Sequence, residues 1–161
     1  MRAFIAASTQ SKPEVLHTEE RFSVKVGATT LVGRIDRIDR AADGAVVITD
    51  YKTGRPRSQQ DADDSLQLSL YALAARETWG YHSERLVFHN LDGNSAISTQ
   101  RSDIQLDEAR LHVEDIAEQI AAGKFEPKAG FHCTWCSYRS LCPKTEKRIP
   151  ELLAIAAAEQ N

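Results

Sequence analysis

The alternation of apolar and polar residues in the first third of the chain predicts three β-strands. They cover residues 15–26, 29–39 and 46–52. The last of them reads VVITDYK, and its apolar run suggests that both faces of this strand are buried. Asp43 and Gly44, before the third strand, are a pair typical of a hairpin turn. We therefore expect the three strands to form one meander.

A helical pattern begins in the middle of the chain. The polar segment at residues 53–64 contains Gly and Pro and predicts a loop. From about residue 65 to residue 79 apolar residues recur at helical spacing, and Gly80 is placed to end this helix. The predicted buried stripe consists of Leu66, Leu70, Leu73 and Ala74.

Two further strands and a second helix follow. The strands are expected at residues 84–91 and 95–101, and the amphipathic helix at residues 106–123. The stripe of that helix consists of Ala109, Val113, Ile116, Ala117 and Ile120. The order of elements predicts a mixed α/β fold in which helices back a sheet.

Charge and composition exclude some classes of protein. The net charge of −3 over 161 residues gives no overall basic surface, so any contact with nucleic acid must use a local one. No apolar run approaches the ~20 residues of a membrane span, and the N-terminus lacks the long apolar core of a secretory signal. We expect a cytoplasmic protein with no membrane partner.

The first candidate for chemistry is the stretch from residue 33 to 54, which places charged residues among isoleucines and valines. Asp50 and Lys52 alternate on one strand and share a face, and the hairpin brings Asp36 opposite Asp50. Two carboxylates suit Mg²⁺ or Mn²⁺, with the peptide carbonyl of Tyr51 as a further ligand. Lys52 could orient an attacking water or neutralise charge on a phosphate. The alternative is a structural ion pair.

Gln67 and Tyr71 lie four residues apart on the first predicted helix and therefore share a face. Gln can brace a metal ligand or contact a phosphate, and Tyr can bond a phosphate or stack on a base. The alternative is the polar edge of an amphipathic helix.

The second candidate is a cluster of cysteines. Cys133, Cys136 and Cys142 are the only cysteines, and an odd, clustered set argues against a disulfide framework and for metal or cluster ligation. Zinc with one histidine is one alternative, and three cysteines without metal are another. The fourth ligand of such a zinc site could be His82, His89 or His112.

Taken in order, the segments GRIDRID, DYKTG, QLSLYALA and CTWCSYRSLCP resemble the RecB-type nuclease family of the PD-(D/E)XK superfamily. The closest resemblance is to the domains at the C-terminal ends of UvrD-like and AddB-like helicase–nucleases, and it runs from about residue 19 to residue 143. It implies a restriction-endonuclease-like fold. The implied roles are metal ligation by Asp36 and Asp50, a catalytic lysine at Lys52, and a Q-x-x-x-Y motif at Gln67 and Tyr71. Glu19 stands where the family often has an acid, and Glu20 is the alternative for that place.

The resemblance also implies a cofactor for the cysteines. In the family's iron–sulfur members three C-terminal cysteines join a distant N-terminal one around a [4Fe–4S] cluster. This sequence has no fourth cysteine, and residues 1–18 offer no clear counterpart of the family's metal-binding histidine. We therefore expect a nuclease core at residues 1–127 without its N-terminal helical segment, and a cluster only in the complete protein. A cysteine knot at residues 128–145 and a helical tail at residues 146–161 would complete the chain.

The function implied is metal-dependent cleavage of DNA, as an exonuclease rather than an endonuclease. The substrate would be a single strand or a duplex end, delivered by a helicase motor during recombination or repair. The alternative is a non-catalytic module that uses the nuclease fold for assembly or DNA binding.

Overall fold

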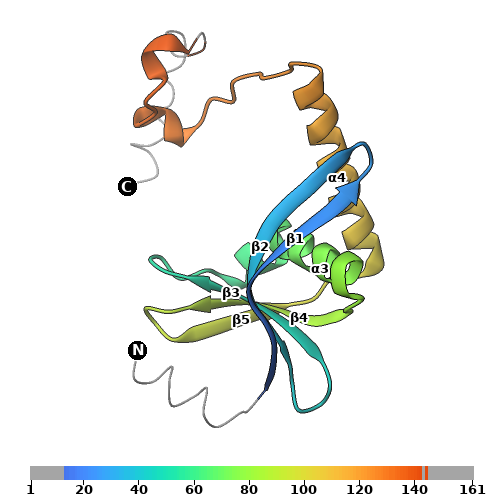
Figure 1. Cartoon of the computed structure of the whole chain (residues 1–161). Helices are drawn as coiled ribbons and strands as arrows, with labels where there is room; N and C mark the ends of the chain where they lie inside the picture. Colours follow the sequence, from blue (N-terminus) through green and yellow to red (C-terminus); the bar gives the residue numbers. More distant parts are fainter. Residues whose placement is uncertain (1–12, 143, 145–161) are drawn as a thin grey trace. The chain divides into compact units, whose positions relative to one another are not determined.

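The computed structural model describes residues 13–142 and residue 144 of the chain. The chain divides into two compact units, residues 1–118 and residues 119–161, and each is treated by itself (Figure 1). The helical tail expected at residues 146–161 lies outside the described residues. No helix in the described part is long and apolar enough to cross a membrane.

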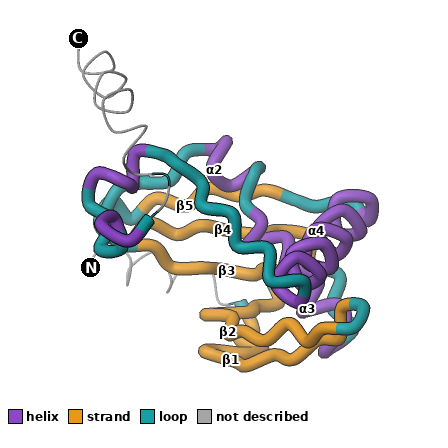
Figure 2. The backbone as a smooth tube through the Cα atoms, turned by 90° about the horizontal axis from the view of Figure 1, so that it is seen from above, coloured by secondary structure: helices purple, strands orange, loops and turns teal. Residues whose placement is uncertain are grey.

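One mixed sheet forms the centre of the first unit. Its strands are β1 (Glu14–Val26), β2 (Thr29–Arg40), β3 (Val46–Lys52), β4 (Ser83–Asn90) and β5 (Ser95–Thr99). They lie in the order β1-β2-β3-β4-β5, and each neighbouring pair is antiparallel except the parallel pair of β3 and β4 (Figure 2). The predicted turn between β2 and β3 is present: Gly44 has φ +87°, and Asp43 Oδ1 accepts a hydrogen bond from the Ala45 amide. The predicted meander and the mixed α/β class are confirmed.

The parallel pair needs a crossover, and α3 (Leu66–Trp79) supplies it. Ser65 Oγ accepts a hydrogen bond from the Leu68 amide and caps the first turn. Gly80 ends the helix in the left-handed conformation, as predicted. The second long helix, α4 (Asp103–Ala121), begins at residue 103 and not at residue 106.

The segment expected as a loop at residues 53–64 contains a short helix, α2 (Gln59–Asp63). Its start is fixed by a capping box in which Ser58 Oγ accepts from the Asp61 amide and Asp61 Oδ2 accepts from the Ser58 amide. The hydrogen bonds from Ser58 lower the pKa of Asp61. The loop prediction is wrong here because Gly and Pro occupy only the first part of the segment, and the Ser-x-x-Asp spacing of the second part starts a helix.

The buried faces of the two long helices also differ from the prediction. In α3, Leu66 and Leu70 are only half-buried. The helix contacts both β1 and β4, so its buried face is wider than the predicted stripe and is centred on other residues. The residues buried there are Leu68, Ser69, Ala72, Leu73, Ala74 and Ala75. In α4, Leu106 and Ala109 are buried, whereas Ile116 and Ile120 of the predicted stripe are exposed.

The β1–β2 pair twists sharply at Asp36. Ile35 and Ile38 are both fully buried, although residues three apart on a regular strand face opposite sides. Glu19, which falls opposite Asp36 between the pairs Thr18↔Arg37 and Glu20↔Ile35, has φ +50°. The β2–β3 ladder ends at Arg37↔Thr49. Beyond this point β2 leaves β3, and the hairpin arm of β1 and β2 continues separately (Figure 1).

The described part of the second unit is short and carries the cysteines. It contains two 3₁₀ turns, η1 (Phe131–Thr134) and η2 (Arg139–Leu141). Trp135 packs edge-on against Phe131 at 4.7 Å between ring centroids, and both side chains remain exposed.

Candidate active site

Asp50 and Lys52 occupy the carboxyl-terminal end of β3. Asp50 is only 3% exposed, and Lys52 Nζ lies 2.7 Å from its Oδ2. The ammonium also lies 5.2 Å from the centroid of the Phe88 ring, which pairs with Asp50 on β4. Oδ2 is buried and accepts no well-directed hydrogen bond from the described residues, so its contact with Lys52 is an ion pair only.

Gln67, at the start of α3, connects this ion pair to Tyr71. Its Nε2 donates to Asp50 Oδ1 at 2.9 Å and to the Tyr71 hydroxyl at 2.8 Å. Its Oε1 accepts from Lys52 Nζ at 2.9 Å. Because a lysine ammonium can only donate, this contact fixes which end of the amide is the oxygen. The structure thus brings four of the five candidate catalytic residues together.

Asp36, the fifth candidate, reaches the site from β2. Its Oδ2 accepts a hydrogen bond from the Tyr51 amide at 2.9 Å. Where β2 leaves β3, this side chain thus replaces the backbone carbonyl that would otherwise accept the hydrogen bond of the Tyr51 amide. Tyr51 lies between Asp50 and Lys52, so the hydrogen bond brings Asp36 next to both. The register predicted from the hairpin is followed down to Arg37↔Thr49, one pair short of Asp36 and Asp50.

Burial and neighbouring charge shape the titration of the site. Burial raises the pKa of Asp50 above its ordinary value; the carboxylate of Asp36 adds to the rise, and the Lys52 ammonium opposes it without cancelling it. Burial also raises the pKa of Tyr71, with Asp50 and Asp36 acting in the same direction. The Tyr71 hydroxyl therefore stays neutral near pH 7.

Three supporting residues were not predicted from the sequence. Phe88 lies beneath the Lys52 ammonium. Asn90 is 2% exposed, and its Oδ1 accepts a hydrogen bond from the Arg57 amide at 3.1 Å, which holds the loop after β3. Arg101 donates to Ser69 Oγ and to the carbonyls of Ala62 and Ser65, where α2 meets α3. Phe88 and Asn90 reach the site through the parallel pairing of β3 with β4, which sets Phe88 beside Asp50 and Asn90 beside Lys52. No local sequence pattern marks Arg101.

Two other acids near the site have different partners. Asp39 makes an ion pair with Arg37 at 2.6 Å and is buried, at 7% exposure. Glu19 makes an ion pair with Arg34 at 3.0 Å, and both side chains are exposed.

The donors available for metals are few. Within residues 13–142 and residue 144, no three His, Cys, Asp or Glu side chains gather into a metal-binding group. Asp36 and Asp50 are therefore two carboxylates without a third such ligand in that part of the chain. Cys133, Cys136 and Cys142 are half-buried, and their expected assembly into a metal-binding knot is not confirmed.

The sequence and the fold both match known proteins. A family model described as the PD-(D/E)XK nuclease superfamily matches residues 1–143. The chain therefore belongs to the PD-(D/E)XK nuclease superfamily. No curated protein matches it at a significant level.

The solved structures similar to this chain include SSO0001 and a protein from Eubacterium rectale. SSO0001 is 18% identical, with a TM-score of 0.52 over 89% of this chain and 68% of its own. The protein from Eubacterium rectale named "Putative exonuclease" is 13% identical, with a TM-score of 0.49 over 84% of this chain and 57% of its own. At these identities the first likeness shows a shared fold.

Proposed function

We propose that this protein is a metal-dependent deoxyribonuclease of the RecB type. The observation that carries the proposal is the single hydrogen-bonded group in which Gln67 joins Asp50, Lys52 and Tyr71. A structural ion pair would need neither the amide nor the phenol. Membership of a nuclease superfamily supports the same chemistry.

The donor set fits a hard divalent cation. Asp36, Asp50 and the carbonyl of Tyr51 would hold Mg²⁺ or Mn²⁺, because these ions prefer oxygen ligands. A bound cation would satisfy the buried Oδ2 of Asp50 and offset the two causes that raise its pKa, which are burial and, to a smaller extent, the charge of Asp36. When bound, the metal polarises the phosphate and lowers the pKa of an attacking water.

The side chains provide positioning and charge. Lys52 is held by Asp50 and Gln67, so its ammonium is available at a fixed place to orient water or to stabilise negative charge on the phosphate. Tyr71 accepts its hydrogen bond from Gln67 and keeps its own proton, which it can donate to a phosphate oxygen.

The test is cleavage of single-stranded and duplex DNA with Mg²⁺, Mn²⁺ or a chelator. We expect metal-dependent cleavage, and none with the Asp50→Ala variant. Addition of the metal should also raise the melting temperature of the wild type and not that of the variant. End-labelled and circular substrates would separate the proposed exonuclease from an endonuclease.

A non-catalytic module is a second candidate, favoured by the absence of a third metal ligand in the described part of the chain. It predicts that DNA remains intact under every metal condition and that neither metal changes the melting temperature. Either metal-dependent change would exclude it.

The wider context rests on sequence resemblance. We propose that the protein works in the cytoplasm with a helicase motor, in the same or a partner chain, during recombination or repair. Cys133, Cys136 and Cys142 would supply three ligands of a [4Fe–4S] cluster in the complete protein. Visible absorbance and iron analysis of the purified protein test for the cluster. If the purified protein instead contains stoichiometric zinc, the cysteines form a zinc site and the cluster proposal is wrong.

A further inference from the structure

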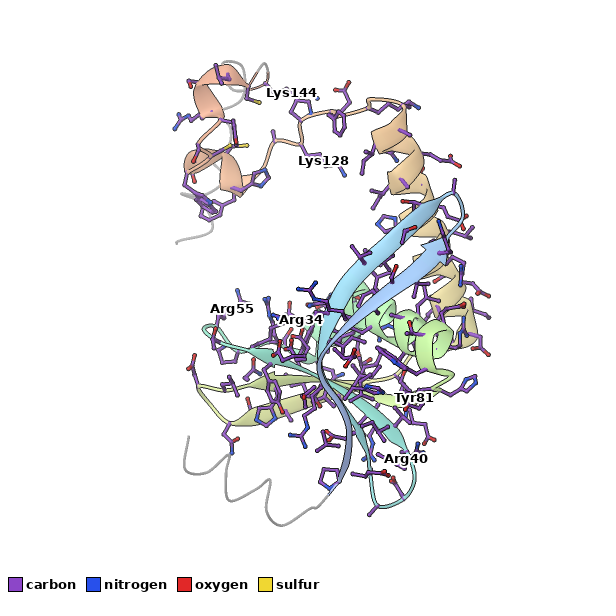
Figure 3. The ribbon with its side chains drawn as sticks, in the orientation of Figure 1. Arg34, Arg40, Arg55, Tyr81, Lys128 and Lys144 are labelled. Atoms are coloured by element: carbon purple, nitrogen blue, oxygen red, sulfur yellow. The ribbon has the colours of Figure 1, made fainter. Side chains whose placement is uncertain are left out.

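Two arginines face each other beside the candidate site. Arg21 on β1 pairs directly with Arg34 on β2. With Phe22, Ser23, Val32 and Gly33 they line an open groove of about 690 Å³ on the hairpin arm. Figure 3 shows Arg34 at the middle of β2 and Arg40 at its far end.

Like charges directly opposite each other destabilise a strand pair, because their side chains start only about 5 Å apart. One of these two is compensated: Arg34 makes its ion pair with Glu19. No hydrogen bond or ion pair joins Arg21 to a described residue, and its side chain is exposed. The groove therefore presents uncompensated positive charge on a chain whose net charge is −3.

The groove adjoins the candidate site along β2. Arg34 precedes Asp36 by two residues, a rise of about 6.6 Å along a strand. Val32, which is 68% exposed, adds apolar surface next to the two guanidinium groups. A guanidinium binds phosphate oxygens as a two-pronged donor, and a sugar–phosphate chain presents phosphates with apolar sugar carbons between them.

We propose that Arg21 and Arg34 bind the phosphates of a DNA strand next to the phosphodiester that lies at Asp36 and Asp50. This inference rests on the proposed function, since it identifies how the substrate of the same site is held. Glu19 occupies Arg34 when DNA is absent, and the phosphate displaces it.

The test measures DNA affinity without cleavage. A fluorescent single-stranded oligonucleotide is titrated with the protein in a chelator, at several salt concentrations, and anisotropy gives the dissociation constant. Arg34→Gln and Arg21→Gln should each weaken binding about tenfold at low salt and reduce the slope of log affinity against log salt by about one. An RNA strand of the same sequence shows whether the contact is confined to DNA.

Arg40→Gln is the matched control, because Arg40 lies on the same strand and pairs with an exposed glutamate, Glu14, at 3.5 Å. Its removal should change affinity less than twofold. Circular dichroism and melting temperature verify that each variant folds.

Glu19→Gln supplies the opposite test, since loss of the competing carboxylate should tighten binding several-fold. Glu84→Gln, an exposed acid on β4, controls for the change in net charge. Equal affinities for Arg34→Gln, Arg21→Gln and Arg40→Gln would overturn the inference, even if the wild type cleaves DNA with metal. If Arg34→Gln and Arg21→Gln lose affinity selectively but the wild type never cleaves DNA, the DNA-binding role of the groove stands and the proposed nuclease function is wrong.

Discussion

Two buried aspartates in this protein have the same local arrangement and different surroundings. Asp39 lies beside Arg37 and Asp50 beside Lys52, each two residues away on one strand, at 2.6 Å and 2.7 Å. Each also retains one buried oxygen without a hydrogen-bond partner among the described residues. By sequence spacing alone the two pairs are equivalent.

Their surroundings separate them. Asp39 is matched by one guanidinium, and the hydrogen bond with Asp39 raises the pKa of Arg37. Asp50 has a second carboxylate nearby, and its own pKa is raised in spite of Lys52. Asp50 thus differs from Asp39 in having a second carboxylate, Asp36, beside it, which is the arrangement expected where a further cation binds.

The largest expected effect is on cleavage. Asp50→Asn should lower metal-dependent DNA cleavage by about 10³-fold, because it removes the charge that holds the metal and Lys52. Rates are measured on single-stranded DNA with Mg²⁺ at a temperature well below melting. Asp39→Asn is the matched variant and should cleave within about twofold of the wild type; equal losses in both would end the distinction between the two pairs.

The second prediction concerns stability and runs in the opposite direction. Asp39→Asn should lower the free energy of unfolding by about 1–3 kcal/mol, because it leaves the half-buried guanidinium of Arg37 without its counter-charge. Urea unfolding at pH 7 without metal measures this change. Under the same conditions Asp50→Asn should not lose stability, and a loss as large as that of Asp39→Asn would make Asp50 a structural residue.

Packing around the site gives the third prediction. A Cβ on Gly33 would lie 2.5 Å from the Phe22 ring, which itself packs edge-on against Tyr71. Gly33→Ala should therefore cost about 1–3 kcal/mol of unfolding free energy and reduce cleavage by displacing Tyr71. Gly93→Ala, where the added carbon meets only Ser95 Oγ at 3.7 Å, is the control. A fully active Gly33→Ala would show that Tyr71 does not depend on this contact.

Two pairs of site residues could be predicted from the sequence, because each pair depends only on the repeat of a single strand or helix. Residues two apart share a strand face and residues four apart share a helix face, so Asp50 with Lys52, and Gln67 with Tyr71, were predictable. The twist at Asp36 could not be predicted in this way. It arises where β2 separates from β3 and the Asp36 carboxylate accepts a hydrogen bond from the Tyr51 amide. Burial of Asp39 depends on the whole sheet, and no local pattern encodes it.

The fourth prediction uses the raised pKa of Asp50. A carboxyl group whose folded-state pKa is raised binds its proton more tightly when folded, so the wild type loses stability as the pH rises from the unfolded value of about 3.9 through the folded one. Asp50→Asn lacks this loss. Without metal, the variant should be the more stable protein at pH 7, and its advantage should vanish below about pH 4. Melting curves between pH 3 and pH 8 measure it; an advantage that persists at pH 3 would have another cause.

The smallest effect is expected for Tyr71→Phe. The hydroxyl accepts one hydrogen bond from Gln67 Nε2, and the same amide still binds Asp50 and Lys52 when the hydroxyl is removed. The ring packing against Phe22 is also retained. Cleavage should therefore fall by about tenfold, within the range for groups that orient a ligand, and the melting temperature should change little. Gln67→Ala removes all three bonds and should cost more than Tyr71→Phe. If Tyr71→Phe were as damaging as Asp50→Asn, the hydroxyl proton would be needed in the reaction itself; the pH profile of Gln67→Ala, which keeps that proton, would then separate the two roles.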